Sequence, residues 1–280
     1  MGPSESSVSL PLSGRSERVR VEGGTLFTTI DEPANSKSPS ILLSNSLATT
    51  HRLWDPQVAF LTKGYRVIRY DTRGHGASDV PPAPYELVQL VADAYAVLDH
   101  FAVEHTAFMG ISLGGITGIG LALTHPDRIE RLICCDARAD APEAFLRAWD
   151  ERVETVRRGG VGTVAAPTLE RWLRPEFRAS ESDSVKHLDE MFRSTPVDGY
   201  VGCVAALKRL DYLKRLAELR VPTLYVVGSE DSAAPAPLMR DMARKTPNAE
   251  LIVIEGSAHL PNLDNSAAFN RSIAPFLGLS

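Results

Sequence analysis

The chain has 280 residues, of which 44% are hydrophobic and 23% are charged, and its net charge is −5 at neutral pH. This composition is typical of a folded globular enzyme, and a chain of this length can bury one large core. The negative charge argues against a general nucleic-acid binder, and no apolar run approaches the roughly 18 residues of a membrane span. We therefore expect neither a nucleic-acid partner nor a membrane partner.

The N-terminal residues and the cysteines bear on the cellular compartment in which we expect the protein. Residues 1–16 are rich in serine and lack the apolar stretch of a signal peptide, so we expect a disordered tail. The three cysteines are odd in number and two of them are adjacent, which predicts neither a disulfide framework nor a CxxC metal pair. Buried, inert thiols fit a reducing compartment, and we expect a cytoplasmic protein.

Short apolar or β-branched runs alternate with helical patterns along the chain. The runs predict eight strands, at Arg18–Val21, Thr25–Ile30, Ile41–Leu43, Tyr65–Tyr70, Thr106–Gly110, Arg131–Cys135, Thr223–Val227 and Leu251–Ile254. Apolar residues at helical spacing predict helices between them, including Tyr85–Phe101, Gly115–Leu123 and Ala267–Leu277. This alternation predicts an α/β fold, with a mostly parallel sheet and helices on both faces.

The alternation stops between about Arg138 and Leu210. This stretch has helical patches, one of them at Ala144–Arg158, but no convincing buried strand. We expect a helical cap over the carboxyl edge of the sheet at residues 138–210, and a core formed by residues 17–137 and 211–280.

The segment Gly110–Gly114 matches the pattern G-x-S-x-G, with Ser112 at its centre. It follows a predicted strand and precedes a predicted helix, which is the context of a nucleophile elbow. There the glycines permit a tight turn, and the start of the helix favours negative charge. We predict that Ser112 is a nucleophile; the alternative is a serine that merely caps the helix.

A serine nucleophile needs a general base from the same edge of the sheet. His259 and His75 both follow predicted strands, and the chain order Ser, Asp, His favours His259. We interpret His75 as a residue that fixes its loop. Asp231 follows the strand at Thr223–Val227 and is our prediction for the acid that orients His259. Asp136, at the same edge, is the competing acid and is otherwise a residue of the substrate pocket.

The remaining parts of the predicted chemistry are backbone groups. The N–H of Leu113, next after the nucleophile, and the N–H of Leu47, in the loop after Ile41–Leu43, are predicted to stabilise an oxyanion. No HExxH motif or cluster with the spacing of metal ligands is present in the sequence, so we expect no metal and no cofactor.

Together these motifs resemble an α/β-hydrolase, and over about residues 25–278 the chain is similar to 3-oxoadipate enol-lactonases. The segments that carry this resemblance are Leu43–Leu47, Trp54–Gln57, Arg69–Ser78, Gly110–Gly115 and Pro196-x-x-Gly199-Tyr200-x-Gly202-Cys203. The resemblance implies a cofactor-free Ser-His-Asp triad that opens an enol-lactone bearing a free carboxylate. The chain departs from that family at Ala48, where Gly is usual, and at Asp136-Ala137-Arg138, where Asn-Thr-Ala is usual. These departures leave the substrate open.

The predicted cap is rich in arginine, and a related group of hydrolases, which cleave amides or vinylogous carbamates of small dicarboxylates, uses cap arginines. Arg152, near Trp149, and Arg171, near Trp172, are predicted to bind a substrate carboxylate, because a guanidinium fork matches that anion. The alternative for Arg152 is a solvent-facing ion pair with a neighbouring acid, Asp150, Glu151 or Glu154.

The sequence thus predicts a cofactor-independent serine hydrolase that acts on a small, anionic lactone, ester or amide. Two alternatives stay open. One is a carbon–carbon bond hydrolase of dienone or β-diketone substrates, and the other is a small-molecule sensor that retains a slow triad. The oligomeric state also stays open, with a homodimer as one alternative.

Overall fold

The structure is a computed structural model that describes residues 14–33, 35, 37–180 and 182–279. Most of the tail predicted at residues 1–16 lies outside the described residues. Arg15 and Ser16, however, belong to the first strand and pair with Ile30 and Thr29, so the predicted end of the tail at residue 16 is wrong. The antiparallel ladder continues there through backbone hydrogen bonds, which the polar side chains of Arg15 and Ser16 do not reveal.

The predicted α/β fold is confirmed, since the described residues form one eight-stranded, mostly parallel sheet. Its strands are β1 (Arg15–Val21), β2 (Gly24–Asp31), β3 (Ser40–Ser44), β4 (Arg66–Tyr70), β5 (Thr106–Ile111), β6 (Ile129–Cys135), β7 (Thr223–Gly228) and β8 (Ala249–Ile254). The spatial order is β1-β2-β4-β3-β5-β6-β7-β8. The pairs β1–β2 and β2–β4 are antiparallel, and every other pair is parallel.

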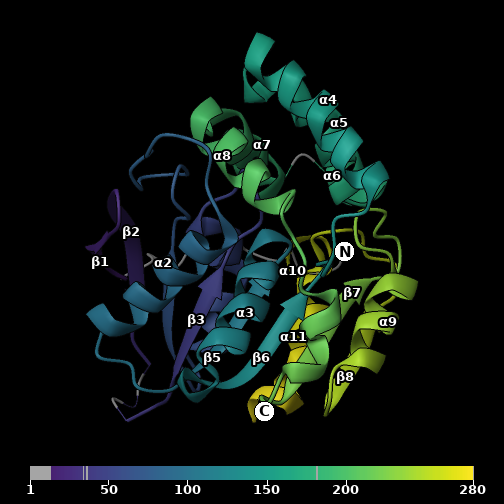
Figure 1. Cartoon of the computed structure of the whole chain (residues 1–280). Coiled ribbons are helices and arrows are strands. Elements are labelled where there is room, and N and C mark those ends of the chain that lie inside the picture. Colours follow the sequence, from purple (N-terminus) through teal and green to yellow (C-terminus); the bar gives the residue numbers. More distant parts are fainter. Residues whose placement is uncertain (1–13, 34, 36, 181, 280) are drawn as a thin grey trace, which may run out of the picture.

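Helices cover both faces of this sheet (Figure 1). The helices of the core are α1 (Asp55–Leu61), α2 (Leu87–His100), α3 (Leu113–Thr124), α9 (Ala236–Lys245), α10 (Pro261–Asp264) and α11 (Ser266–Leu277). Helices α2, α3 and α9 lie on the face toward the viewer in Figure 1, and α11 lies on the opposite face, where it contacts α1. Short 3-10 helices occur at His51–Trp54, Pro126–Arg128, Val161–Val164 and Leu213–Glu218.

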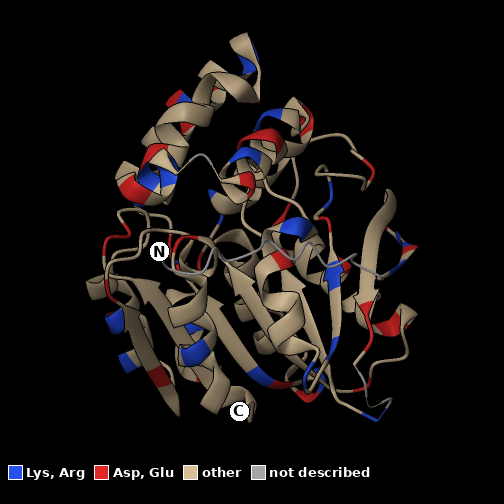
Figure 2. Cartoon of the chain, turned by 180° about the vertical axis from the view of Figure 1, so that it is seen from behind, with Lys and Arg blue, Asp and Glu red and all other residues tan. Residues whose placement is uncertain are grey.

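The central strands are apolar because both of their faces are covered. Every residue of β5 and β7 is buried, whereas β1, at the edge, is mostly exposed. Figure 2 shows the same division by charge, since charged residues lie on the helices, the loops and the strand ends, and the middle of the sheet carries few of them. The core therefore forms a packed platform in which the parallel strands β3 to β8 end at one common edge.

In the described part of the chain, helices α4 to α8 interrupt the core between β6 and β7 and lie above the carboxyl ends of the strands (Figure 1). Their bounds are α4 (Glu143–Gly159), α5 (Ala165–Trp172), α6 (Pro175–Ala179), α7 (Asp183–Ser194) and α8 (Val197–Leu207). A backbone bridge between Asp140 and Asp211 joins the two ends of this cap. Among the described residues, no helix has the length and apolarity that crossing a membrane requires.

The cap contacts the core closely at one pair of glycines. A Cβ atom on Gly199, in α8, would lie 1.9 Å from the carbonyl oxygen of Gly74, which belongs to the loop after β4. Gly74 itself has φ 77°, in the left-handed region that favours glycine. Any side chain at Gly199 would therefore force the cap helix away from the loop.

Candidate active site

Four chemically active side chains follow four neighbouring strands at the same edge of the sheet. Ser112 comes directly after β5 and Asp136 directly after β6. Asp231 follows β7 by three residues, and His259 lies in the loop after β8. Because these strands are parallel and adjacent, their carboxyl ends bring the four residues together.

Ser112 lies on a strained turn between β5 and α3. Its backbone has φ 54° and ψ −116°, which side-chain-bearing residues rarely adopt. A Cβ atom on Gly110 would lie 2.2 Å from the carbonyl oxygen of Gly114, and one on Gly114 would lie 2.2 Å from that of Ser44. Both glycines are therefore required for the turn, which has the geometry of a nucleophile elbow.

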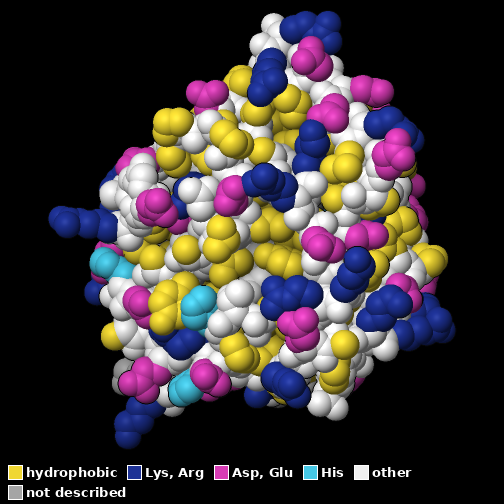
Figure 3. Space-filling model, in the orientation of Figure 1, with side chains coloured by type: hydrophobic (Ala, Val, Ile, Leu, Met, Phe, Trp, Pro, Cys, Tyr) yellow, Lys and Arg dark blue, Asp and Glu magenta, His cyan; other side chains and the backbone are white. Residues whose placement is uncertain are grey.

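Above the elbow, the core and the cap enclose a cavity of about 400 Å³. Ser112 and His259 line its floor, and α4, α5, α7 and α8 supply residues of its walls. Its larger apolar side chains are Leu47, Ile116, Phe145, Trp149, Trp172, Phe192 and Leu207. In Figure 3, apolar side chains gather between the cap helices and the core. A small molecule in this cavity would contact mostly apolar walls next to Ser112.

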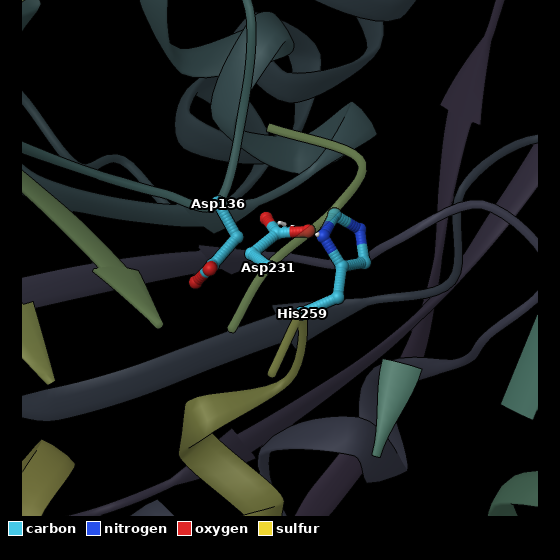
Figure 4. Close-up of side chains that lie close together, drawn as sticks. All are labelled: Asp136, Asp231 and His259. Atoms are coloured by element: carbon cyan, nitrogen blue, oxygen red, sulfur yellow. Dashed lines mark hydrogen bonds and ion pairs between the residues drawn. The ribbon is translucent and has the colours of Figure 1, made fainter. Parts of the chain in front are cut away.

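Asp231, and not Asp136, is hydrogen-bonded to the ring of His259. His259 Nδ1 lies 2.9 Å from Asp231 Oδ2, and both side chains are buried (Figure 4). Burial raises the pKa of Asp231, but the His259 ring and the N–H groups of Ala233 and Ala234 outweigh it and hold this pKa below its usual value. Asp231 is therefore a carboxylate that accepts a hydrogen bond from Nδ1–H, which leaves Nε2 free to take up a proton.

Nε2 points away from the two carboxyl groups (Figure 4), and His259 and Ser112 line the same cavity. Both residues are described by the structure, and the Ser112 hydroxyl has no hydrogen bond to the His259 ring. Catalytic hydrogen bonds are often long without substrate and shorten once it binds.

The loop predicted to supply Leu47 N–H is fixed from below by His75. His75 Nε2 accepts the N–H of Ala48 at 3.0 Å, and Nδ1 lies 3.1 Å from the carbonyl oxygen of Arg73. Because Nε2 accepts, the proton is on Nδ1, and burial lowers the pKa of His75, which keeps the ring neutral. Ala48 has φ 59°, in the region that favours glycine, so the loop is strained at this residue.

Leu113 is placed to supply the other donor. It is the first residue of α3, so its N–H has no partner within the helix. Leu113 directly follows Ser112, and Leu47 lines the cavity beside Ser112. Both predicted oxyanion donors therefore lie next to the elbow.

Arg152 points into the cavity rather than toward its acidic neighbours on α4. Its guanidinium donates to the hydroxyls of Tyr200 and Thr168, and it lies 5.5 Å from the centre of the Trp149 ring. Asp150, one of the acids in the alternative interpretation, pairs with Lys208 instead. Arg152 is thus held by neutral groups and keeps its positive charge at the cavity.

Arg171 lines the same cavity from α5 and donates to the carbonyl oxygen of Pro167 at 3.3 Å. Arg171 is exposed to solvent, yet desolvation by the groups around it and the positive charge of Arg152 lower its pKa. Among the ion pairs of the described residues, neither Arg152 nor Arg171 has an acidic partner, whereas Arg138, also at the cavity, pairs with Asp140 at 3.0 Å. Two neighbouring unpaired cations favour an anion between them.

Comparison with known proteins agrees with this geometry. The family model for the alpha/beta hydrolase fold matches residues 39–266. The chain belongs to the α/β-hydrolase family. It is 34% identical over 235 residues to 3-oxoadipate enol-lactonase 2 of Acinetobacter baylyi, a match that covers 84% of this chain and 87% of that protein.

Two solved structures extend the comparison to three dimensions. The enol-lactonase from Burkholderia xenovorans is 33% identical with a TM-score of 0.89, and the match covers 94% of this chain and 100% of that one. A thermophilic esterase from Thermogutta terrifontis, with malate bound, is 26% identical with a TM-score of 0.85, covering 94% and 98%. The protein is therefore an enzyme of the α/β-hydrolase family, as the sequence predicts.

Sequence reasoning missed several residues of this α/β-hydrolase's cavity. Tyr200 and Thr168 hold Arg152, and Phe145 and Phe192 form part of the apolar wall. Only Tyr200 gave a signal, as part of the segment Pro196–Cys203 that resembles the enol-lactonases. The other three belong to cap helices whose orientation over the core the sequence does not define.

In the cluster of Asp136, Asp231 and His259, the ring nitrogen nearest the carboxyl groups is already hydrogen-bonded. The three side chains offer atoms within 4.8 Å of one another, a spacing that a metal ion could use. His259 Nδ1, however, already binds Asp231, and Nε2 points away from both carboxyl groups (Figure 4). A metal ion at this cluster would have to displace the hydrogen bond between His259 and Asp231.

Proposed function

We propose that this α/β-hydrolase opens a small carboxylate-bearing lactone, or cleaves a related ester, through an acyl-enzyme on Ser112. One observation carries the proposal: Ser112, His259 and two arginines, Arg152 and Arg171, that have no acidic partner among the described residues all border one cavity, and Asp231 is hydrogen-bonded to His259. The cavity thus offers a nucleophile beside a site for an anion.

The residues have defined roles in this mechanism. Ser112 Oγ attacks the carbonyl carbon while His259 Nε2 takes its proton, and the N–H groups of Leu113 and Leu47 stabilise the oxyanion. The carbon–oxygen bond then breaks, and His259 returns the proton to the leaving oxygen. Water, deprotonated by His259, attacks the acyl-enzyme and releases the acid, which regenerates the Ser112 hydroxyl.

Three observations support an anionic substrate. Arg152 and Arg171 present unpaired positive charge beside apolar walls, where pairing with a carboxylate is stronger than in water. Two of the relatives are named as enol-lactonases, and a third has malate, a small dicarboxylate, bound.

Steady turnover of simple esters would distinguish this hydrolase function from that of a small-molecule sensor with a slow triad.

Removal of the arginine charges tests the proposal. We expect R152Q and R171Q each to raise KM for p-nitrophenyl hemisuccinate about tenfold or more, since a hydrogen bond to a charged group contributes about 1.5–3 kcal/mol. KM for p-nitrophenyl butyrate, which is neutral and of similar size, should change little. R178Q is the matched control, because Arg178 is in the cap but pairs with Glu170 outside the cavity. Equal effects on both esters would reject the anion site.

A further inference from the structure

Asp136 lies directly behind the acid that orients His259. It is 1% exposed, and its Oδ1 accepts the N–H of Gly228 at 2.9 Å. Asp136, Asp231 and His259 each place an atom within 4.8 Å of the others, and Figure 4 shows Asp231 between the other two. Two carboxyl groups and one imidazole therefore share a buried pocket.

This pocket holds too little positive charge for two carboxylates. Among the described residues, no lysine or arginine forms an ion pair with Asp136 or Asp231. The Oδ2 atom of Asp136 is buried and accepts no hydrogen bond from any described group. Asp136 also lines the cavity, although its side chain is buried. Two buried carboxyl groups this close together do not both ionise readily, and a proton on Oδ2 would remove the repulsion and give that atom a hydrogen bond to donate.

Asp231 is the partner that keeps its charge. It accepts hydrogen bonds from the His259 ring and from Ala233 N–H, whereas among the described residues the one donor to Asp136 is Gly228 N–H. The balance of donors therefore favours a shared proton on Asp136 rather than on Asp231.

The other ionisable groups near this pair strengthen that assignment. Asp264, in α10, adds negative charge, and Cys134 and Cys135, in β6, are buried neutral thiols. The positive charge of Arg171, in α5, interacts with Asp231. Burial first, and then the charge of Asp231, raises the pKa of Asp136 well above its usual value.

We propose that Asp136 is a positioning residue that carries a proton in the active enzyme and donates it, as a hydrogen bond, to the Asp231 carboxylate. Asp231 then accepts from both sides, which fixes the carboxylate that orients His259. The proton stays on Asp136 through the reaction. This inference rests on the proposed triad of Ser112, His259 and Asp231.

Infrared difference spectra test the proton directly and need no substrate. In D136N the amide keeps an acceptor for Gly228 N–H and a donor for Asp231, but has no carboxyl group. At neutral pH, the spectrum of the wild type minus that of D136N should contain the carbonyl band of one protonated carboxylic acid. The bands of other buried carboxylic acids cancel in the difference spectrum, because these groups are present in both proteins. A carboxylate band in its place would overturn the proposal.

Nuclear magnetic resonance of the His259 ring tests the hydrogen bond. If Asp136 is neutral, the titration midpoint of His259 should be nearly the same in D136N and in the wild type. An ionised Asp136 would instead require a fall of about one pH unit or more in D136N, because a negative charge close to the ring is lost. In D136A the midpoint should rise, since Asp231 loses a donor that disperses its charge. A purely structural role would leave the midpoint of D136A unchanged.

Kinetics with p-nitrophenyl butyrate complete the test. We expect kcat of D136A to fall about tenfold at nearly constant KM, and D136N to recover most of that loss. Equal losses in the two variants would overturn the proposal. If D136A does not fold, the infrared and resonance measurements on D136N still decide the question. Failure of the proposed triad is recognised separately, by S112A retaining activity while the infrared band is present.

Discussion

At the scale of single residues, the proton on Asp136 links folding to pH. An unfolded Asp has a pKa of about 3.9, whereas burial and the neighbouring Asp231 raise the pKa of Asp136 in the folded protein. A raised pKa means that the contribution of Asp136 to stability is full below about pH 3.9 and declines as pH rises toward its folded value. Over that range the folded state binds one proton more than the unfolded state.

Replacement of this one group should therefore change the pH dependence of stability. As pH rises from about 5 to about 7, the wild type should lose stability that D136N does not lose. The free energy of unfolding of D136N minus that of the wild type should therefore grow, by up to about 1.4 kcal/mol per pH unit for one proton. Urea denaturation of both proteins across this range measures the difference. Parallel curves for the two proteins would show that Asp136 does not take up a proton on folding.

At the scale of elements, the cap is tied to the loop that carries His259. Leu260 N–H donates to the carbonyl oxygen of Trp172 at 3.2 Å, and the Trp172 ring lies 5.6 Å from the His259 ring. Asp264, in α10, accepts the N–H groups of Ala258 at 3.0 Å and of Arg174 at 3.3 Å. The segment between α5 and α6 and the histidine loop therefore form one connected unit.

Loss of the Asp264 carboxyl group should loosen both parts of that unit. We expect D264A to lower kcat about tenfold and to destabilise the protein by about 1–3 kcal/mol, because a buried N–H group, of Ala258, and a partly buried one, of Arg174, lose their acceptor. D264N keeps an acceptor oxygen and should retain more activity. Steady-state kinetics and thermal unfolding measure both effects, with the exposed Asp241, paired with Lys245 on α9, as the control in D241N. A D264A enzyme with wild-type kcat would contradict this role.

The elements also show how far the sequence alone could lead. Fully buried strands such as β5 and β7 are predictable, because nothing but an apolar run fits between two layers of helices. Asp136 and Asp231 are not separable in this way, since both follow strands at the same edge. Their roles differ through a contact with His259, which lies 28 residues beyond Asp231. The partner of Arg152 is likewise Tyr200, 48 residues away, in a helix whose packing no local pattern specifies.

At the scale of the whole molecule, the proposed function assigns chemistry and recognition to different parts of the chain. The rigid sheet edge positions Ser112, Asp231 and His259, whereas the cap contributes Arg152 and Arg171 to the cavity above them. Changes in the cap can therefore alter which substrate binds without moving the groups that react. In the proposed reaction, the substrate that the cap binds transfers its acyl group to Ser112, so transfer to Ser112 is the step to test.

The most direct test of this account is the mass of the protein during turnover. Wild-type enzyme mixed with p-nitrophenyl butyrate and quenched in acid should carry one butyryl group, on the peptide that contains Ser112. S112A should carry none, and its kcat should fall by several orders of magnitude, on the order of 10⁶ where a triad serine has been removed. An S112A enzyme that turns over the ester at nearly the wild-type rate, or a butyryl group on another residue, would contradict the assignment of Ser112 as the nucleophile.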